Sequence, residues 1–516
     1  MTTPGRAGTA VAVVGGGIAG LTAAWELTGG AIGPGPDTPH VVLLEADSRL
    51  GGKLAGAEID GRPVDVGPDG FLGRRPEAHD LCVEVGLGDD LVPIGASGAT
   101  VYARGAPRRL PDGLFLGVPT RYLPVARSGI LSPLGSARLA VDVVAPLPDR
   151  RGPLGDRAIG PLVSRKLGHE VVDRLVEPLL GGIYGGSVAD ASAAAVLPAL
   201  LRVAKGRASL MRSLRRMAAG GAAVPGPAPG GTARPVEGAH DSHTAAAPAF
   251  WALRGGLGSL TDRLGVELAT RGVEVRTSAP VQALVRTEDR WLIHSAQGSF
   301  SVDGVVLALP ASPAASLLAP HDAHAASHLE QMAYASVAVV TFAFGAGALP
   351  ADLFGTGLLV PRGTPLPPRT AASLGASPGE TAMVTACTYL STKWPHLAAA
   401  DGTRLVRASV GRHGDERFAA MDDGALTRRV AAEVAGFLGV TAAARSSIVT
   451  RWPDALPQYR VHHLLRVGAV DAAVKRLDGL AVAGAAYRGV GIPACIASGR
   501  EAARDVLSRL EATRTI

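Results

Sequence analysis

The chain has 516 residues, of which 47% are hydrophobic and 19% charged, and its formal net charge is +6. This composition excludes a disordered protein, and the length predicts two or three domains. No block of about five consecutive basic residues occurs and no apolar run reaches the ~18 residues of a membrane span, which argues against nucleic-acid binding and a transmembrane helix. None of the three cysteines lies in a CxxC pair. The sequence therefore predicts neither a disulfide framework nor a zinc site, and a reducing cytosol fits.

The first predicted elements form a β-α-β unit. Residues 10–14 are a short apolar run typical of a strand buried on both faces, and a helix and a second strand follow. The intervening turn is Gly15-x-Gly17-x-x-Gly20, in which the first glycine permits a tight turn, the second a close pyrophosphate and the third close helix–strand packing. Glu45 ends the second strand, where a carboxylate binds ribose hydroxyls. The unit predicts a dinucleotide site with its phosphates at the helix N-terminus.

Further along the chain, strand and helix signals come from separated segments. Residues 111–220 contain several helix-like stretches, whereas residues 219–249 are rich in small and polar residues without apolar periodicity and are expected to form a flexible insertion. Strand signals return in residues 273–309. A last buried strand, residues 480–484, precedes a Gly-rich turn and a helix. One domain is therefore expected to be assembled from segments that are far apart in the sequence.

Three short segments favour FAD over NAD as the cofactor. Arg49-Leu50-Gly51-Gly52-Lys53 is a basic-Gly-Gly element that would bring backbone and a cation near the pyrophosphate. Asp65-Val66-Gly67-Pro68-Asp69 is expected to form a turn beneath the flavin. Gly484 and Gly489-Val490-Gly491-Ile492 begin a helix whose N–H groups would face the flavin ring or its ribityl chain. Because cofactor elements occur at both chain ends, an NAD dehydrogenase is disfavoured.

With these motifs in place, the chain resembles the protoporphyrinogen/coproporphyrinogen oxidases, a family of monoamine-oxidase-like flavoproteins, over residues 9–512 apart from the insertion. Glu177-Pro178-Leu179-Leu180-Gly181-Gly182-Ile183-Tyr184-Gly185-Gly186 is similar to the family's substrate-cavity segment. Gly357-Leu358-Leu359-Val360-Pro361 is similar to its strand over the flavin. Two further matches are Lys393-Trp394-Pro395 and the late Trp…Pro-Gln-Tyr motif in Trp452-Pro453-Asp454-Ala455-Leu456-Pro457-Gln458-Tyr459.

The resemblance implies an α/β and α+β fold. A Rossmann-like FAD-binding domain of the glutathione-reductase and amine-oxidase type would be accompanied by a mixed-sheet substrate domain and a helical subdomain. The expected ranges are 8–95, 250–312 and 476–516 for the FAD-binding domain, 96–110 and 313–475 for the substrate domain, 111–218 for the helical subdomain and 219–249 for the insertion.

The motifs and the resemblance together imply the site residues. Those expected to bind FAD are Gly15, Gly17, Ile18, Ala19, Gly20, Glu45, Ala46, Arg49, Gly52, Lys53, Gly67, Pro68, Asp69, Gly70, Val281, Trp452, Gly484, Gly489, Val490, Gly491 and Ile492. Those expected to line the substrate cavity are Gly182, Ile183, Tyr184, Thr356, Leu358 and Leu359. No metal and no catalytic side chain are expected, because hydride equivalents would pass to flavin N5.

The resemblance implies oxidation of a porphyrinogen to a porphyrin in three two-electron cycles, with dioxygen reoxidising the flavin to give hydrogen peroxide. Actinobacterial and firmicute relatives act on coproporphyrinogen III, and an acidic tetracarboxylate suits a basic protein. We therefore expect FAD-dependent oxidation of coproporphyrinogen III to coproporphyrin III in haem biosynthesis, with protoporphyrinogen IX as the alternative substrate.

Other proteins of this fold are weighed against that expectation. A flavin amine oxidase or a carotenoid desaturase is a second alternative. Amine oxidases cage the flavin with two aromatic side chains, whereas one aromatic residue, Tyr487, lies near the C-terminal turn here. Rab escort and dissociation-inhibitor proteins lack a functional flavin site, and the intact glycine pattern argues against that class.

Location and partners follow from the family as well. The expected location is the cytoplasm, with peripheral contact at the inner face of the membrane as an alternative. Downstream enzymes of haem synthesis are candidate partners, and no nucleic-acid partner is expected.

Several single residues carry separate expectations. Eukaryotic members hold a propionate with an arginine where Ala99 stands here. The nearby Arg104, Arg108 and Arg109 are candidates for this role, but exposed, solvated charges are favoured. His462-His463 is expected to be a loop or surface pair rather than a metal site. Cys495 is expected to be a small buried residue rather than a covalent flavin link.

Overall fold

The computed structural model describes residues 8–146, 155–204, 208–219 and 248–514. Its first layer is a parallel sheet in the strand order β12-β2-β1-β16-β22. The strands are β1 (Ala10–Val14), β2 (His40–Leu44), β12 (Glu274–Arg276), β16 (Gly304–Leu307) and β22 (Leu480–Val482). In register, Val13 of β1 lies between Leu43 and Val306. The expected assembly from the start, middle and end of the chain is confirmed.

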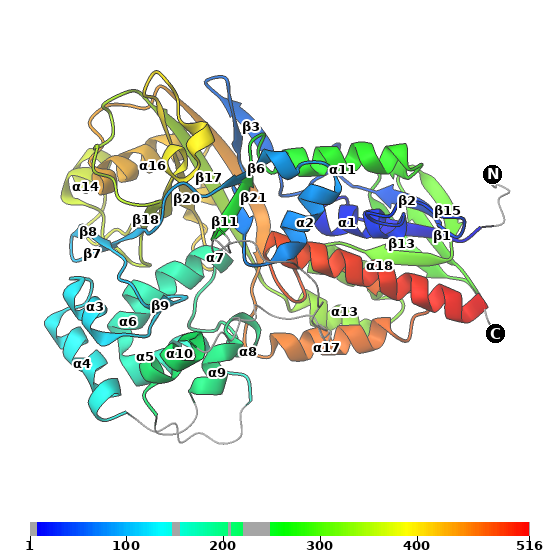
Figure 1. Ribbon diagram of the computed structural model, residues 1–516, viewed down its shortest axis with the longest axis horizontal. Coiled ribbons are helices and arrows are strands. Elements are labelled where there is room, and N and C mark those ends of the chain that lie inside the picture. The colour runs from blue at the N-terminus through cyan, green and yellow to red at the C-terminus, as the bar shows by residue number, and fades with distance from the viewer. Residues whose placement is uncertain (1–7, 147–154, 205–207, 220–247, 515–516) are drawn as a thin grey trace, which may run out of the picture.

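Both faces of the parallel sheet are covered, which is why its strands are continuous apolar runs. One face packs against helices α1 (Ile18–Leu27), α2 (Pro76–Glu84), α11 (Gly258–Thr270) and α18 (Ile492–Arg514) (Figure 1). The other face packs against a small antiparallel sheet and three helices, namely β13 (Val281–Arg286), β14 (Trp291–Ser295), β15 (Gly298–Val302), α12 (Ala311–Leu318), α13 (Ala323–Glu330) and α17 (His463–Val474).

A seven-stranded mixed sheet forms the opposite end of the molecule in Figure 1. Its order is β21 (Ser446–Pro457), β17 (Tyr334–Phe344), β20 (Arg404–Val410), β19 (Val384–Tyr389), β18 (Gly357–Leu359), β7 (Thr100–Ala103) and β8 (Ala106–Arg109). Helices α14 (Pro368–Leu374) and α16 (Asp423–Leu438) cover one face of this sheet, which we call the helix-covered face. The other face packs through Ala343 and Leu405 against Val66 of the turn at residues 65–70. We call it the flavin-side face, because this turn is the one expected to lie beneath the flavin.

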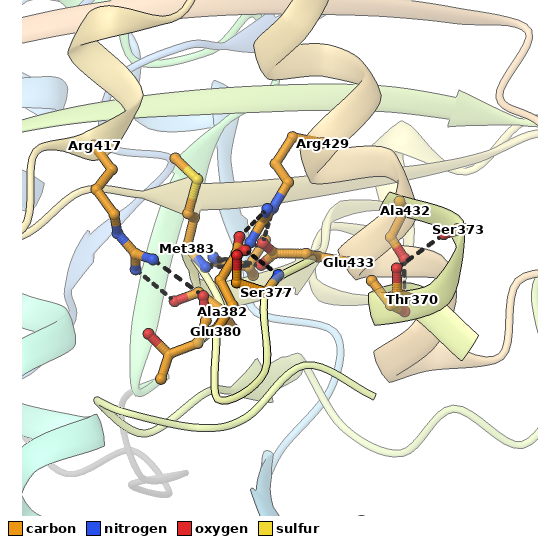
Figure 2. A network of polar contacts seen from close by, with 12 residues as sticks. Thr370, Ser373, Ser377, Glu380, Ala382, Met383, Arg417, Arg429, Ala432 and Glu433 are labelled. Atoms are coloured by element: carbon orange, nitrogen blue, oxygen red, sulfur yellow. Dashed lines mark hydrogen bonds and ion pairs between the residues drawn. The ribbon is translucent and has the colours of Figure 1, made fainter. Parts of the chain in front are cut away.

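A buried carboxylate ties α16 to the helix-covered face (Figure 2). Glu433 is fully buried and accepts hydrogen bonds from Met383 N at 2.9 Å and from Val384 N at 2.9 Å. Arg429 Nε lies 2.6 Å from the same carboxylate and also pairs with Glu380. A buried charge that is paired and hydrogen-bonded in this way specifies how helix and sheet pack.

A third body of helices, below the seven-stranded sheet in Figure 1, packs around its own apolar core. They are α3 (Tyr122–Arg127), α4 (Pro133–Val144), α5 (Ile159–Leu167), α6 (His169–Val171), η2 (Val172–Gly181), α7 (Gly182–Tyr184), α8 (Ala193–Val196), α9 (Pro198–Val203) and α10 (Leu210–Ala219). The η2 segment is a π-helical stretch that contains Pro178. A proline lacks the N–H of a regular helical ladder, so it suits such a widened turn.

Short elements connect these layers. They are β3 (Gly56–Ile59), β4 (Arg62–Asp65), β5 (Phe71–Leu72), η1 (Gly88–Asp90), β6 (Leu91–Pro93), β9 (Leu114–Phe115), β10 (Val118–Pro119), β11 (Phe250–Leu253), α15 (Leu390–Lys393), η3 (Pro395–Leu397) and η4 (Arg417–Ala420). Among the residues that the structure describes, no helix is both long and apolar enough to cross a membrane.

One expected boundary needs correction. The sequence assigned residues 313–475 to the substrate domain, but α13, α17 and most of α12 pack in the core of the parallel sheet. Helical periodicity reveals an apolar face but not which sheet the helix will cover, so the sequence offered no basis for placing these helices correctly. Most of the expected insertion, residues 220–247, lies outside the described residues.

Candidate functional site

The N-terminal glycine turn is built by close backbone contacts. Gly15 has a φ of 106° and donates a hydrogen bond to Leu44 O at 2.7 Å. A Cβ atom on Gly20 would lie 1.8 Å from Gly15 O, so only glycine lets α1 approach β1 this closely. By contrast, no atom lies within 4 Å of a Cβ placed on Gly17. Because α1 has no side-chain cap, this space adjoins first-turn N–H groups suited to an anion.

Glu45 and the basic-Gly-Gly element border the same turn. A Glu45 carboxylate oxygen accepts a hydrogen bond from Gly16 N at 2.6 Å, and Gly51 N donates to Gly16 O at 2.8 Å. The Arg49 guanidinium donates to the carbonyl of Gly52, so it stabilises the turn that it precedes. The sequence expected these residues to gather at one place, and the fold brings them together.

Two further residues expected to bind the cofactor, Lys53 and Val281, lie close to this turn. The Lys53 side chain is accessible, but the surrounding protein desolvates its ammonium group and lowers its pKa, an effect partly offset by Cys495 and Asp454. Val281 begins β13 just after Ala279, whose N–H donates to Glu45 O at 2.8 Å.

Asp69 is the charged centre of the turn at residues 65–70. Its carboxylate accepts hydrogen bonds from Lys393 Nζ at 2.9 and 3.0 Å and from Trp394 Nε1 at 2.9 Å, and it pairs with Arg407 Nη2 at 3.0 Å. Burial alone would raise the pKa of this carboxyl group, but Arg407 and Lys393 outweigh burial and hold the pKa well below its usual range. The Asp69 side chain therefore anchors the turn. The Lys393-Trp394 match is explained by this contact.

Further groups fix the same turn. Trp452 Nε1 donates to Val66 O at 2.8 Å, and Arg407 Nη1 donates to Gly67 O at 2.8 Å. Asp65 accepts a hydrogen bond from Leu257 N at 2.7 Å. Burial, together with the nearby Asp69 charge, raises the pKa of Asp65 to about 7. Sequence reasoning missed Arg407 and the raised pKa of Asp65, because neither depends on a local pattern.

The loop between β22 and α18 is held by two aromatic side chains. Tyr459 Oη donates to Ala485 O at 2.5 Å and accepts from Gly489 N at 2.7 Å. The His463 ring stacks on the Tyr459 ring at 3.9 Å, and its Nε2 lies 2.8 Å from Tyr487 O. Burial lowers the pKa of His463 to about 4. The imidazole is therefore neutral at pH 7, and Nε2 is the nitrogen that donates to this carbonyl.

The prediction of a surface histidine pair is wrong for His463. His462 is exposed, but α17 begins at His463 and directs that side chain into the core, where it is 2% exposed. Tyr487 also packs into this core, and no described residue bonds its hydroxyl group. Cys495 is buried as predicted, and burial raises the pKa of its thiol to about 11.

The predicted cavity segment and the late Trp…Pro-Gln-Tyr motif meet in space. Gln458 Nε2 donates to Tyr184 O at 2.8 Å, and the rings of Tyr184 and Tyr459 lie 6.0 Å apart. A small pocket open to solvent lies between the two segments, and Tyr184 is the expected cavity residue that lines it. Two motifs that are far apart in the sequence therefore form one wall.

Of the residues expected to line the substrate cavity, Gly182, Ile183 and Leu359 remain candidates, whereas Leu358 does not. Gly182 faces Leu359, since a Cβ on Gly182 would lie 4.0 Å from Leu359 Cδ2, and Ile183 is 49% exposed. The expectation does not hold for Leu358, which is 1% exposed in the core beneath α16. Neighbouring residues of a strand point to opposite faces, so Leu358 and Leu359 cannot line the same cavity. Thr356 precedes β18 and donates to Gly98 O at 3.1 Å.

Sequence reasoning also missed a group of basic residues beside the cavity segment. Arg362 pairs with the buried Glu177 at 3.4 Å and donates to His413 O at 3.3 Å. The Arg460 guanidinium contacts His413 Nε2. Arg412 is 9% exposed, and no described carboxylate lies within ion-pair distance of it. These residues come from three separate loops, so no sequence motif reveals them. The expected candidates Arg104, Arg108 and Arg109 lie instead at the edge strand β8 and its turn.

Residues 18–507 match the family model described as flavin containing amine oxidoreductase. The chain belongs to this family. It is 34% identical over 494 residues to the coproporphyrinogen III oxidase of Mycobacterium leprae, covering 95% of this chain and 96% of the relative. It is 30% identical over 502 residues to the coproporphyrinogen III oxidase of Bacillus subtilis, covering 97% and 98%. The crystal structure of a protein from Exiguobacterium sp. 255-15, assigned as a protoporphyrinogen oxidase, matches with a TM-score of 0.79 and 30% identity over 98% of this chain and 100% of that one.

This flavin amine oxidoreductase is an FAD-dependent enzyme, and its residues fit the cofactor. Space at Gly17 and the uncapped start of α1 suit a pyrophosphate, and Glu45 stands where a ribose is expected. Hydrogen bonds within the protein fix both the turn at residues 65–70, through Asp69, and the loop before α18, through Tyr459. When bound, FAD supplies two-electron oxidation chemistry.

Proposed function

We propose that this flavoenzyme oxidises coproporphyrinogen III to coproporphyrin III in haem biosynthesis, with dioxygen as the electron acceptor and hydrogen peroxide as the second product. The observation that carries the proposal is the contact between Gln458 and Tyr184, which joins the two family-specific motifs beside the loop that leads into α18. Similarity over nearly the whole chain to proteins named coproporphyrinogen III oxidase supports it. Protoporphyrinogen IX is the alternative substrate.

The proposal includes the residues that hold FAD. Gly15–Gly20 and Arg49–Lys53 would bind the pyrophosphate, and Glu45 the adenosine ribose. The turn at Gly67–Gly70, supported by Trp452, and the loop at Gly484–Ile492 would bind the flavin and the ribityl chain. Their hydrogen bonds within the protein leave the backbone of both turns in fixed positions, so the cofactor would meet a preorganised surface.

The chain's own contribution to the reaction is binding and orientation. Ile183 and Leu359 offer apolar surface between the cavity segment and the seven-stranded sheet, which suits the face of a macrocycle and excludes water. The proposed reaction requires no side-chain base. Tyr184 and Tyr459 do not supply a base either, because burial raises the pKa of both phenols above the usual value and both stay protonated at pH 7.

The basic group beside the cavity segment favours a substrate with several carboxylates. Burial, and repulsion from Arg362, lower the pKa of Arg412 to about 10, an effect partly offset by Glu177 and Asp415, so the guanidinium stays charged at neutral pH. A buried cation without an ion-pair partner is stabilised by a bound anion, and a guanidinium is suited to a carboxylate. Four propionates offer more such contacts than the two carboxylates of protoporphyrinogen IX.

Aerobic turnover of both porphyrinogens by flavin-loaded protein, followed by porphyrin fluorescence, tests the proposal. We expect a higher kcat/KM for coproporphyrinogen III. The Arg412→Gln variant is expected to raise KM for this substrate about tenfold, as for a lost charged contact. Arg428→Gln, an exposed arginine on α16, is the matched control and leaves KM unchanged. A higher kcat/KM for protoporphyrinogen IX would make it the proposed substrate instead. Formation of no porphyrin from either compound would overturn the proposal.

A cytoplasmic location with peripheral membrane contact is part of the same proposal. Helix α10 buries Met211 and Leu214 and exposes Arg212, Arg215 and Arg216, so its outer side is basic. Basic helix surfaces bind anionic lipid headgroups. Sedimentation with vesicles of anionic lipid, compared with neutral vesicles, tests it; equal binding to both would count against a basic contact.

A further inference from the structure

The loop between β22 and α18 carries the glycines proposed to face the flavin, and its own backbone contacts are few. Ala483 N donates to Leu307 O at 2.9 Å and Gly484 N to Ser498 Oγ at 3.0 Å, which fixes the start of the loop. Over the next five residues, the backbone contact from Tyr487 N to Gly484 O is long, at 3.4 Å. The path of residues 485–489 must therefore be set from outside the loop.

Two side chains bond the backbone of this stretch, and the Arg488 side chain also pairs with Asp471 of α17. Tyr459 Oη binds Ala485 O and Gly489 N, which are the two ends of the stretch, and His463 Nε2 donates to Tyr487 O in its middle. The two rings are nearly parallel, at 15°, with centroids 3.9 Å apart. Tyr459 is 3% exposed and His463 2% exposed, so water cannot replace these hydrogen bonds.

Tyr459 is itself fixed by parts of the molecule outside the parallel sheet. Its carbonyl accepts a hydrogen bond from Ser192 N at 2.7 Å, at the start of α8. The neighbouring Gln458 binds Tyr184 O, and the Tyr184 ring lies beside the Tyr459 ring. The helical body, the cavity segment and the C-terminal loop thus meet at one side chain.

We propose that Tyr459, supported by His463, is a positioning residue for the flavin: its hydroxyl group sets the path of residues 485–489 and so the orientation in which Gly489–Gly491 meets the ring. The inference depends on the proposed FAD site. Tyr459 acts through the loop backbone rather than on the reacting atoms, so it is not a catalytic residue.

The Tyr459→Phe variant of the full-length protein tests the inference. Phenylalanine keeps the ring and the stacking on His463 but leaves Gly489 N and Ala485 O without their partner. We expect the dissociation constant of FAD, titrated into the apoprotein, to rise about tenfold. The visible circular dichroism of bound FAD should change, and its midpoint potential should shift. In turnover, kcat should fall while KM stays within about twofold, since the cavity wall keeps its shape.

A matched control and a second variant guard against a general loss of structure. Tyr102→Phe makes the same substitution on the helix-covered face, where the Tyr102 ring packs against Phe437 and no described residue bonds its hydroxyl group. It should leave FAD binding and the flavin spectrum unchanged. His463→Phe keeps the stacking but loses the bond to Tyr487 O, and an intermediate change is expected.

The outcomes are distinct. A flavin spectrum, potential and FAD affinity in Tyr459→Phe that match those of the parent protein would overturn the inference. So would changes of equal size in Tyr102→Phe. If Tyr459→Phe does not fold, His463→Phe decides by the same readouts. FAD binding and the flavin spectrum need no porphyrinogen, so a failure of the proposed reaction would leave this test intact.

Discussion

Two buried carboxylates lie against opposite faces of the seven-stranded sheet, and they stabilise different kinds of contact. On the flavin-side face, Asp69 pairs with Lys393 and Arg407 of the sheet region, although it is 324 residues from Lys393 in sequence. On the helix-covered face, Glu433 binds backbone N–H groups of β19 and Arg429 of its own helix (Figure 2). Paired charges therefore join the turn at residues 65–70 to residues far away in the sequence in one case, and a helix to the sheet that it covers in the other.

Removal of Asp69 is expected to have the largest effect. In Asp69→Ala, two buried cations lose their shared carboxylate, which lowers the free energy of unfolding by about 3–5 kcal/mol. The turn at residues 65–70 also loses its anchor, so FAD affinity should fall by at least about tenfold. Denaturant unfolding and FAD titration of the apoprotein measure both effects. Unchanged FAD affinity would show that the turn is held without Asp69.

Removal of Glu433 is expected to affect stability but not FAD binding, in contrast to removal of Asp69. Glu433→Ala leaves two buried N–H groups and Arg429 without an acceptor, so unfolding should become easier by about 3 kcal/mol or more. FAD affinity should remain within about twofold, because the carboxylate supports only the helix-covered face. The same two measurements apply. A loss of FAD affinity as large as in Asp69→Ala would break the distinction between the faces.

Asp65 adds a pH dependence on the flavin-side face. Its pKa is raised from 3.8 to about 7 in the folded protein, so its stabilising contribution is full below pH 3.8 and is lost as pH rises to about 7. Asp65→Asn removes this dependence. The free energy of unfolding of the variant minus that of the parent protein should therefore increase between pH 4 and 7, by up to about 1.4 kcal/mol per pH unit. A constant difference across this range would contradict the assignment.

The smallest expected effects come from single hydrogen bonds on each face. Trp452→Phe loses the bond to Val66 O, and Thr370→Val loses the bond from Thr370 Oγ1 to Ala432 O. Each should lower the free energy of unfolding by about 1 kcal/mol. Only Trp452→Phe should weaken FAD binding, by about threefold. Equal FAD affinities in the two variants would argue against a special role for the flavin-side face.

Local patterns in the sequence predicted the parts of the site that local contacts build. The glycine turn at Gly15–Gly20 and the acid at Glu45 depend on steric rules within one β-α-β unit, so both could be expected from residue types alone. The burial of His463 could not, because it depends on a loop more than 20 residues later. The opposite orientation of Leu358 and Leu359 follows from the alternation of side chains along a strand and could have been expected. Which of the two faces the cavity could not, because that depends on the pairing of β18 with β7 and β19.

The position of β22 affects the order in which the protein can be made. This strand pairs with β16 at the edge of the parallel sheet and leads into α18, which packs against α1. Ribosomes add roughly 5–20 residues per second, so the first strand waits on the order of half a minute or longer before its sheet can be completed. During that time the apolar faces of β1 and α1 lack their final cover, which makes the nascent chain a candidate for chaperone binding. Because β22 and α18 flank the loop proposed to contact the flavin, we expect FAD to bind only after both elements have been synthesised.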